Sequence, residues 1–294
     1  MISEILETYA EITEEAIERY IPDRECLQRR VIEAARYSLT AGGKRIRPAL
    51  VMEFCRVCGG EPETALPVAC AIEMMHTFSL IHDDLPCMDN DDMRRGKPSC
   101  HKAFGEADAL LAGDALAIMP AEIIAGAALK GIIPQTAALK IIELLGKHAG
   151  IYGMIGGQVI DTENVGKQLD TPIMLEMYRM KTGALLEFCC RAGCITAGAG
   201  AAKQLAAGSY GQRLGLAFQI IDDILDVTAD EKRLGKPVGS DAESGKFTYV
   251  TAVGLDKARA EAERLTKEAE KCLEEFEDNE ALMELTEMLL KRDY

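Results

Sequence analysis

Two clusters of aspartates are the residues in this sequence best suited to chemistry. Each cluster follows a long apolar segment, so each is expected at the end of a buried helix. A single run of this kind usually forms a solvated helix end, but two runs in matching contexts indicate a shared role. The members are Asp83, Asp84 and Asp89 in the first cluster and Asp222, Asp223 and Asp226 in the second.

The spacing of the second cluster favours a bound divalent cation. Asp222 and Asp226 are four positions apart, so on a helix their like charges lie on one face and repel. A bound cation reverses that effect, and carboxylates without Cys or His partners suit Mg²⁺, which also keeps water and phosphate ligands. In the first cluster we expect Pro86 to end the helix and a turn to bring Asp89 back beside Asp83.

Basic residues near both clusters could hold phosphate groups. Arg binds phosphate bidentately, whereas Lys acts as a point charge. The sequence also suggests that Lys181-Thr182-Gly183 opens a helix, where backbone N–H groups favour anions. The candidates are Lys44 and Arg47 after a double glycine, Arg94, Arg95 and Lys97 after the first cluster, Lys181, and Lys236 in a loop after the second cluster.

His76 is the histidine best placed to join this chemistry. It precedes Asp83 by seven positions and so shares a helix face with it, from which it could donate to a phosphate. The alternative is an ordinary core histidine. We find no Ser-His-Asp or Cys-His pattern and no phosphate-binding P-loop in the sequence.

Charge and composition exclude several classes of protein. The chain of 294 residues has a formal charge of −15 and no Trp, which argues against a nucleic-acid partner. The acidic N-terminus lacks the features of a signal peptide, and we identify no membrane-spanning stretch, so we expect a cytoplasmic protein without membrane insertion. The ten cysteines then suggest reduced thiols, and Cys55 and Cys58 are interpreted as core residues at a helix end.

Helical periodicity runs through the whole chain. Most segments are filled by Ala, Leu, Ile, Met, Glu and Lys, and no linker divides the sequence, so we predict one all-α domain over residues 1–294. Pairs of glycines and single prolines, including Pro67, are expected at breaks between helices. Pro120 stands inside a helical pattern and should kink or break that helix.

Several motifs together resemble the trans-polyprenyl (isoprenyl) diphosphate synthase family over residues 37–249. They are GGKRIRP, SLIHDDLPCMDNDDMRRGKP, GGQVID, KTGAL, FQIIDDILD and LGKPVGSD. The resemblance implies the isoprenoid synthase fold, with roughly ten or more helices around a deep central cavity. It also implies a prenyltransferase of isoprenoid biosynthesis, a homodimer, and three Mg²⁺ ions.

The resemblance further assigns roles to individual residues. Asp83, Asp89 and Asp222 would bind Mg²⁺ directly, and Asp84, Asp223 and Asp226 would assist directly or through water. Isopentenyl diphosphate would bind to Lys44, Arg47, His76 and Arg95. The allylic diphosphate would be surrounded by Arg94, Lys181, Thr182, Gln219 and Lys236.

Product length is indicated by the residues before the first cluster. Phe78 and Ser79 lie five and four positions before Asp83, and in the family a bulky aromatic there stops chain growth early. We therefore predict the fifteen-carbon product, farnesyl diphosphate, with Phe78 as an ordinary core residue as the alternative. Geranylgeranyl diphosphate synthesis, a non-catalytic regulatory subunit of a heteromeric synthase and a terpene cyclase are the competing functions.

Overall fold

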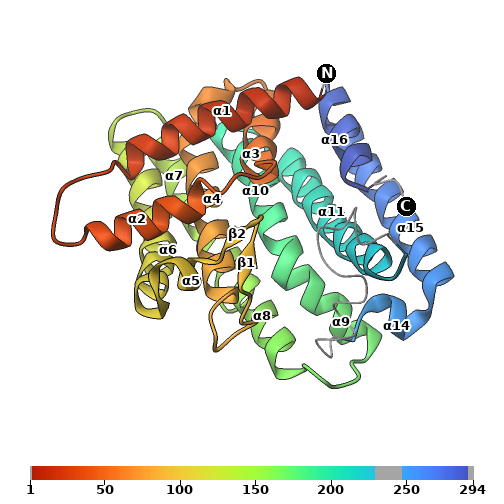
Figure 1. Ribbon diagram of the computed structural model, residues 1–294. Helices are drawn as coiled ribbons and strands as arrows, with labels where there is room; N and C mark the ends of the chain where they lie inside the picture. The colour runs from red at the N-terminus through yellow and green to blue at the C-terminus, as the bar shows by residue number, and fades with distance from the viewer. Residues whose placement is uncertain (1, 229–246, 291–294) are drawn as a thin grey trace. The chain divides into compact units, whose positions relative to one another are not determined.

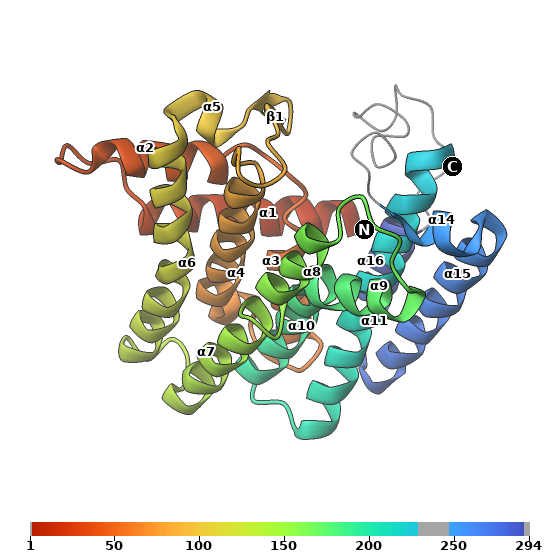
Figure 2. The same cartoon turned by 90° about the horizontal axis from the view of Figure 1, so that it is seen from below.

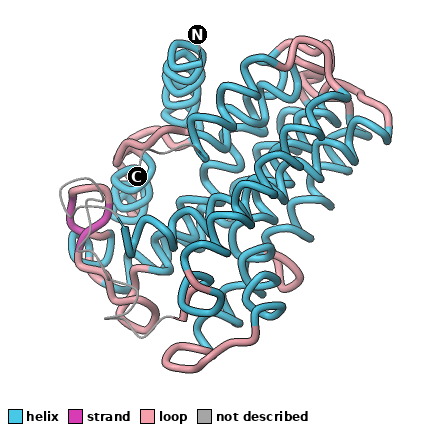
Figure 3. Tube along the Cα trace, turned by 90° about the vertical axis from the view of Figure 1, so that its right-hand side faces the viewer, coloured by secondary structure: helices cyan, strands magenta, loops and turns pink. Residues whose placement is uncertain are grey.

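The computed structural model describes residues 2–228 and 247–290, and there the chain is helical apart from one short two-stranded hairpin (Figures 1 and 3). The predicted all-α class is confirmed. Contacts between Cα atoms divide the chain into two compact units. The first comprises Met1–Ile142 with Ile195–Gly198, and the second Glu143–Cys194 with Ala199–Tyr294.

The first unit is built around α4. This helix is apolar on all sides, contacts α3 and α6, and buries a continuous stretch of its middle turns. The elements of the unit are α1 (Ile2–Tyr20), α2 (Arg29–Leu39), α3 (Ile46–Arg56), α4 (Pro62–Asp83), β1 (Met93–Arg94), β2 (Lys97–Pro98), α5 (Cys100–Phe104) and α6 (Glu106–Leu129), and α7 (Gln135–Ala149) crosses the boundary between the units.

The bounds of α4 follow from its sequence. Pro62 occupies the first turn, where its missing N–H costs nothing. The helix ends at Asp83, with Asp84 as the C-cap residue and Pro86 shortly after it. The predicted helix end before Pro86 is therefore confirmed.

Two prolines lie inside helices: Pro67 was expected at a break, and Pro120 was expected to kink or break its helix. Pro67 is within α4, and Pro120 is within α6, which continues to Leu129. Both prolines are buried. The expectation of a break was wrong because burial along a long apolar helix outweighs the local loss at one proline.

The second unit is built around α11, which packs along α15 (Figure 2). Glycines on α11 allow its neighbours to approach closely: a Cβ on Gly211 would lie 2.7 Å from the Glu187 backbone, and one on Gly215 would lie 2.6 Å from the Gly183 Cα atom. The elements are α8 (Met154–Glu163), α9 (Thr171–Tyr178), η1 (Arg179–Gly183), α10 (Ala184–Thr196), α11 (Ala201–Thr228), α14 (Tyr249–Val253), α15 (Leu255–Cys272), η2 (Leu273–Glu275) and α16 (Glu280–Leu290).

The Lys181-Thr182-Gly183 segment does not open a helix. It forms the π-helical turn η1, which continues directly from α9 and into α10. The prediction of free N–H groups at a helix N-terminus was therefore wrong, since this segment is in the middle of a longer helical run. π-Helical turns inside helices are frequent at functional sites.

Two helices meet the length and composition of a membrane span, which the sequence analysis did not identify. In α4, 67% of the apolar window is buried, and in α6 the value is 39%. Large apolar side chains on α6, including Leu111, Ile118 and Leu129, are exposed. Of the two cysteines predicted as core residues, Cys55 is buried and Cys58 is only partly buried, and neither forms a disulfide.

Candidate functional site

The first acidic cluster lies at the C-terminal end of α4. Asp83 is partly exposed and Asp89 is exposed, and the Asp89 N–H donates to the Asp83 carbonyl oxygen at 2.9 Å. The predicted turn that returns Asp89 to Asp83 is thus confirmed at the level of the backbone.

Asp84 differs from its neighbours because it is buried against Arg94. The Arg94 Nε atom donates to Oδ1 at 3.0 Å and to Oδ2 at 3.2 Å, and Nη2 also donates to Oδ1. Burial raises the pKa of Asp84, and the Arg94 guanidinium only partly offsets this effect. Within this unit, Asp84 therefore fixes the position of Arg94.

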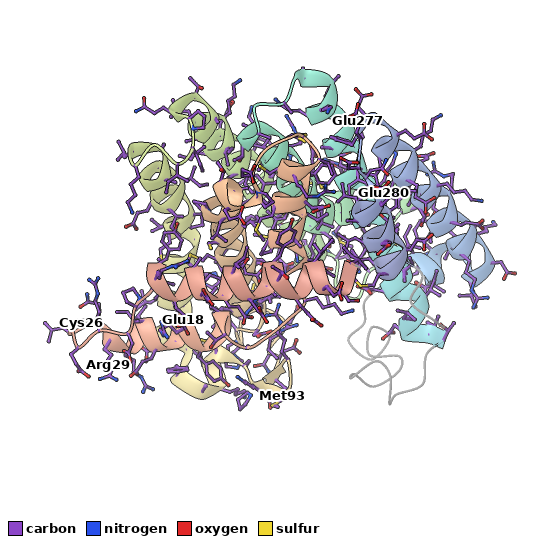
Figure 4. The ribbon with its side chains drawn as sticks, turned by 90° about the horizontal axis from the view of Figure 1, so that it is seen from above. Glu18, Cys26, Arg29, Met93, Glu277 and Glu280 are labelled. Atoms are coloured by element: carbon purple, nitrogen blue, oxygen red, sulfur yellow. The ribbon has the colours of Figure 1, made fainter. Side chains whose placement is uncertain are left out.

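The β1–β2 hairpin presents both Arg94 and Arg95. Its two central residues, Arg95 and Gly96, have φ values of 52° and 75°, as a tight two-residue hairpin turn requires. The Arg95 Nη1 atom donates to the Gly42 carbonyl oxygen. Met93, on the same hairpin, is exposed (Figure 4).

Arg45 is the N-cap residue of α3, between Lys44 in the preceding loop and Arg47 in the first turn of the helix, and sequence reasoning missed its role. Its buried guanidinium donates from Nη1 to Glu73 Oε1 at 2.8 Å and from Nη2 to the Leu39 carbonyl oxygen at 2.6 Å. It holds a left-handed backbone conformation, with φ of 47°. In sequence, Arg45 and Glu73 are only two charged residues in different segments, and nothing there indicates that they pair.

His76 and the surrounding arginines form a cationic region of the first unit. Loss of water around the ring lowers the pKa of His76 well below its ordinary value, and the charges of Arg47 and Arg95 add to this shift. His76 is therefore neutral at pH 7 and can still donate one ring N–H. Lys44, which precedes Arg47 by three residues in the sequence, is exposed.

A pocket in the first unit lies beside these residues. It has about 360 Å³ of empty space, partly open to solvent. The lining residues include Tyr37, Thr77, Asp84, Arg94 and Arg95, so a carboxylate, two guanidiniums and hydroxyl groups border the same space.

Phe78 is partly buried against the hydrophobic core of the first unit. Its ring meets the His82 ring edge-on, with centroids 4.8 Å apart. The His82 Nε2 atom is 3.1 Å from the Leu110 carbonyl oxygen of α6, and Gly113 leaves room for the ring, since a Cβ there would lie 2.2 Å from Nε2. The Phe78 ring thus packs against the His82 ring, which is itself in contact with α6.

The second acidic cluster lies in the last turns of α11. Asp222 is partly exposed, whereas Asp223 and Asp226 are buried. The Asp223 Oδ2 atom accepts from the Tyr178 hydroxyl at 2.7 Å and from the Tyr249 N–H at 2.8 Å. Asp223 therefore links α9 and α14 to α11.

The turn η1 brings Lys181 and Thr182 into contact with neighbouring helices of the second unit. The Lys181 Nζ atom pairs with Asp161 Oδ2 at 2.5 Å, and the Thr182 hydroxyl donates to Gln219 Oε1 at 3.2 Å. Gly157 allows the approach, because a Cβ there would lie 2.3 Å from the Lys181 backbone nitrogen. Asp161 ends the GGQVID motif, which was the signal that could have identified it.

Magnesium is the cation that the donor set fits. The candidate ligands are carboxylate oxygens without sulfur or imidazole partners. Within residues 2–228 and 247–290, no group of three or more His, Cys, Asp or Glu side chains is preassembled around a common point. Lys236, predicted to bind substrate, lies outside the described residues.

Known proteins resemble this chain over almost its full length. A family model described as polyprenyl synthetase matches residues 28–289. The farnesyl diphosphate synthase of Geobacillus stearothermophilus is 43% identical over 294 residues, which cover 100% of this chain and 98% of that protein. The large subunit 1 of the chloroplastic heterodimeric geranylgeranyl pyrophosphate synthase of Arabidopsis thaliana is 45% identical over 265 residues, 89% of this chain and 71% of that protein.

A solved structure shows the same fold. The geranylgeranyl pyrophosphate synthetase of Pyrococcus horikoshii superimposes with a TM-score of 0.91 and 33% identity, covering 99% of this chain and 98% of that one. The sequence family and the helical architecture therefore agree.

Proposed function

We propose, from the premise that this chain belongs to the polyprenyl synthetase family and is a trans-prenyl diphosphate synthase, that its main product is farnesyl diphosphate. The reaction condenses isopentenyl diphosphate head-to-tail with dimethylallyl and then geranyl diphosphate, releasing diphosphate at each step. The observation that supports the fifteen-carbon product is Phe78, whose ring packs against His82, which in turn contacts α6.

Geranylgeranyl diphosphate is the alternative product. Geranylgeranyl diphosphate synthases resemble this chain as strongly as the farnesyl enzyme does, at 45% against 43% identity. The two products differ by a single five-carbon addition, so the decision rests on where growth stops. In this proposal Phe78, with Ser79 beside it, limits the length of the chain.

We propose two separate groups of residues for the two diphosphate substrates. Lys44, Arg47, His76 and Arg95 bind isopentenyl diphosphate, and the support is that the charges of Arg47 and Arg95 both act on His76. The groups proposed to bind the allylic diphosphate are Arg94, Lys181, Thr182, Gln219 and Lys236.

Magnesium would be held by the aspartates of both clusters. In this proposal three ions bind through Asp83, Asp89, Asp222 and Asp226, with Asp84 and Asp223 supporting them. The bound ions would neutralise the diphosphate and favour its departure.

The side chains of the chain itself contribute positioning and charge. Lys181 and Arg94 stabilise negative charge on the departing diphosphate, because fixed cations act strongly where water is scarce. The allylic C–O bond breaks to give a delocalised carbocation, which the double bond of isopentenyl diphosphate attacks. A proton is then lost to the diphosphate, so no side-chain base is required. Apolar side chains must exclude water, which would otherwise capture the cation.

A product assay tests the proposal. The purified chain is incubated with Mg²⁺, isopentenyl diphosphate and dimethylallyl or geranyl diphosphate, and product length is read by chromatography. Farnesyl diphosphate supports the proposal, and a twenty-carbon product supports the alternative. A regulatory subunit would give no product alone, and a cyclase would release hydrocarbon without consuming isopentenyl diphosphate.

The two-cluster mechanism has its own test. Replacing Asp83 or Asp222 by Ala is expected to lower the rate by orders of magnitude, since each carboxylate is a proposed ligand of the cations that activate the leaving group. Near-normal turnover in either variant contradicts the mechanism.

We also propose a homodimeric, cytoplasmic enzyme in which residues 1–294 act as one polyprenyl synthase domain. The exposed apolar residues of α6 support pairing with a second copy, and the family model spans both units. Light scattering of the purified protein tests the dimer, and cell fractionation tests the location. Limited proteolysis tests whether the units separate. No nucleic-acid partner is expected at a charge of −15.

A further inference from the structure

A tyrosine just before the π-helical turn contacts the second acidic cluster. The Tyr178 hydroxyl donates to Asp223 Oδ2 at 2.7 Å, and both side chains are buried. The same oxygen accepts the Tyr249 N–H at 2.8 Å. A buried carboxylate requires such donors, because an unsatisfied charge in the interior is costly.

The contact joins two elements that carry proposed ligands. Tyr178 is the last residue of α9, and η1 begins at the next residue and carries Lys181. Asp223 follows Asp222 directly on α11. The hydroxyl–carboxylate bond therefore ties the start of η1 to the turn of α11 that holds Asp222.

Two further contacts make this junction rigid. The Thr182 hydroxyl donates to Gln219 at 3.2 Å, one helical turn before Asp223. A Cβ on Gly215 would lie 2.6 Å from the Gly183 Cα atom, so the two backbones are in direct contact one further turn back. Three successive turns of α11 thus contact successive parts of η1 and its flanks.

We propose that Tyr178 is a positioning residue for the prenyl transfer reaction. Through Asp223 it fixes the second acidic cluster relative to Lys181, and it touches neither substrate nor metal. Tyr178 thereby sets how well Mg²⁺ and the allylic diphosphate are bound, while isopentenyl diphosphate binding is independent of it. This inference rests on the proposed assignment of Asp222 and Lys181 to that site.

The substitution Tyr178→Phe removes one hydroxyl and keeps the ring. Hydrogen bonds to charged groups support an effect of about 10-fold. We expect kcat/KM for the allylic substrate to fall about 10-fold and the half-saturating Mg²⁺ concentration to rise about 3-fold or more. The KM for isopentenyl diphosphate is expected to stay within 2-fold of the unsubstituted protein.

Tyr210→Phe is a matched control. Tyr210 is also buried in the second unit, and its hydroxyl is hydrogen-bonded to Thr286 Oγ1 at 2.8 Å, away from the acidic cluster in sequence and in partners. This variant loses the same chemical group, so we expect a similar loss of stability without a change in Mg²⁺ dependence.

Direct binding gives a readout besides activity. Calorimetric titration of Mg²⁺ into protein with inorganic diphosphate is expected to show weaker binding in Tyr178→Phe and unchanged binding in Tyr210→Phe. All measurements are made below the unfolding transition of each variant, with the folded fraction checked by circular dichroism. A loss of stability alone then does not imitate a loss of positioning.

The possible results distinguish a failure of the proposed role of Tyr178 from a failure of the proposed function. Allylic and Mg²⁺ constants that match those of Tyr210→Phe, or an equal loss for both substrates, overturn the role of Tyr178. If Asp222→Ala is inactive in the same experiment, the proposed function survives that failure. If Asp222→Ala retains normal turnover, the proposed function itself is wrong.

Discussion

A partly buried carboxylate in the second unit offers a quantitative test of the structure. Glu187 on α10 is surrounded by donors from three helices. Its Oε1 atom is 2.9 Å from Arg191 Nη1 and 3.2 Å from His148 Nε2, and its Oε2 atom accepts from Gln212 Nε2 at 2.6 Å. The side chain is only 12% exposed, so water screens these interactions weakly.

The expected magnitude follows from the pKa of Glu187. Burial opposes ionisation, but hydrogen bonds and charge from His148, Gln212 and Arg191 outweigh it and lower the pKa from 4.5 to about 2. At about 1.4 kcal/mol per unit, this shift stabilises the folded state by about 3 kcal/mol. Because the folded-state pKa is the lower one, this contribution is complete above about pH 4.5 and is lost as the pH falls toward 2.

The perturbation is Glu187→Gln, which keeps the shape and removes the charge. We expect the free energy of unfolding at pH 7 to fall by about 3 kcal/mol, measured by urea denaturation. Between pH 5 and pH 3.5 the unsubstituted protein should lose stability faster than the variant. Glu143→Gln is the matched control, because Glu143 is exposed and forms an ion pair with Lys147, which is also exposed. A loss below about 1 kcal/mol in Glu187→Gln, with an unchanged pH dependence, refutes the reasoning.

The remaining predictions concern product length and helix packing. Phe78→Ala is expected to lengthen the product by at least one five-carbon unit, as read by chromatography, because it removes the ring proposed to stop chain growth; an unchanged product contradicts that role. Gly215→Ala is expected to destabilise the protein by about 1–3 kcal/mol in urea denaturation, since its Cβ would meet the Gly183 backbone at 2.6 Å. Gly126→Ala faces open space on α6 and should stabilise the protein by about 0.5–1 kcal/mol, so equal effects of the two alanines would show that the packing argument is wrong.

Local patterns in the sequence predicted much of the fold. The helical class followed from apolar periodicity, and the end of α4 followed from Pro86, because a proline removes a backbone donor and disfavours continuation of a helix. The continuation of α6 through Pro120 could not be predicted in this way. The cost of this proline is local and fixed, while the benefit of continuing α6 depends on burial that only the tertiary structure reveals.

The candidate residues were found in sequence, but their arrangement was not. Lys181 was identified by its motif, whereas the π-helical turn that carries it depends on close packing at Gly157 and Gly215. Nothing in a single sequence marks a backbone that must approach within contact distance of a glycine far along the chain. The same limit hid the Arg45–Glu73 pair, whose members are distant in sequence and meet only after α3 and α4 have packed.

The two Asp-Asp pairs look alike in sequence. In the structure the second Asp of each pair is a buried hydrogen-bond acceptor, and the donors differ between the two units. Asp84 accepts hydrogen bonds from the Arg94 guanidinium, and Asp223 accepts them from the Tyr178 hydroxyl and the Tyr249 N–H. In each unit a buried carboxylate fixes a donor: Arg94 is itself a proposed diphosphate ligand, and Tyr178 lies three residues before another, Lys181. A neutral donor at Asp223 adds no positive charge beside the second cluster, whereas Arg94 brings one to the first.

If both carboxylates serve positioning, Asp84→Asn should weaken the site more than Asp223→Asn, because it also removes the counter-charge of a buried guanidinium. The rate of prenyl transfer at saturating Mg²⁺ measures this order, and the reverse order would show that Asp223 acts on the metal rather than on the fold.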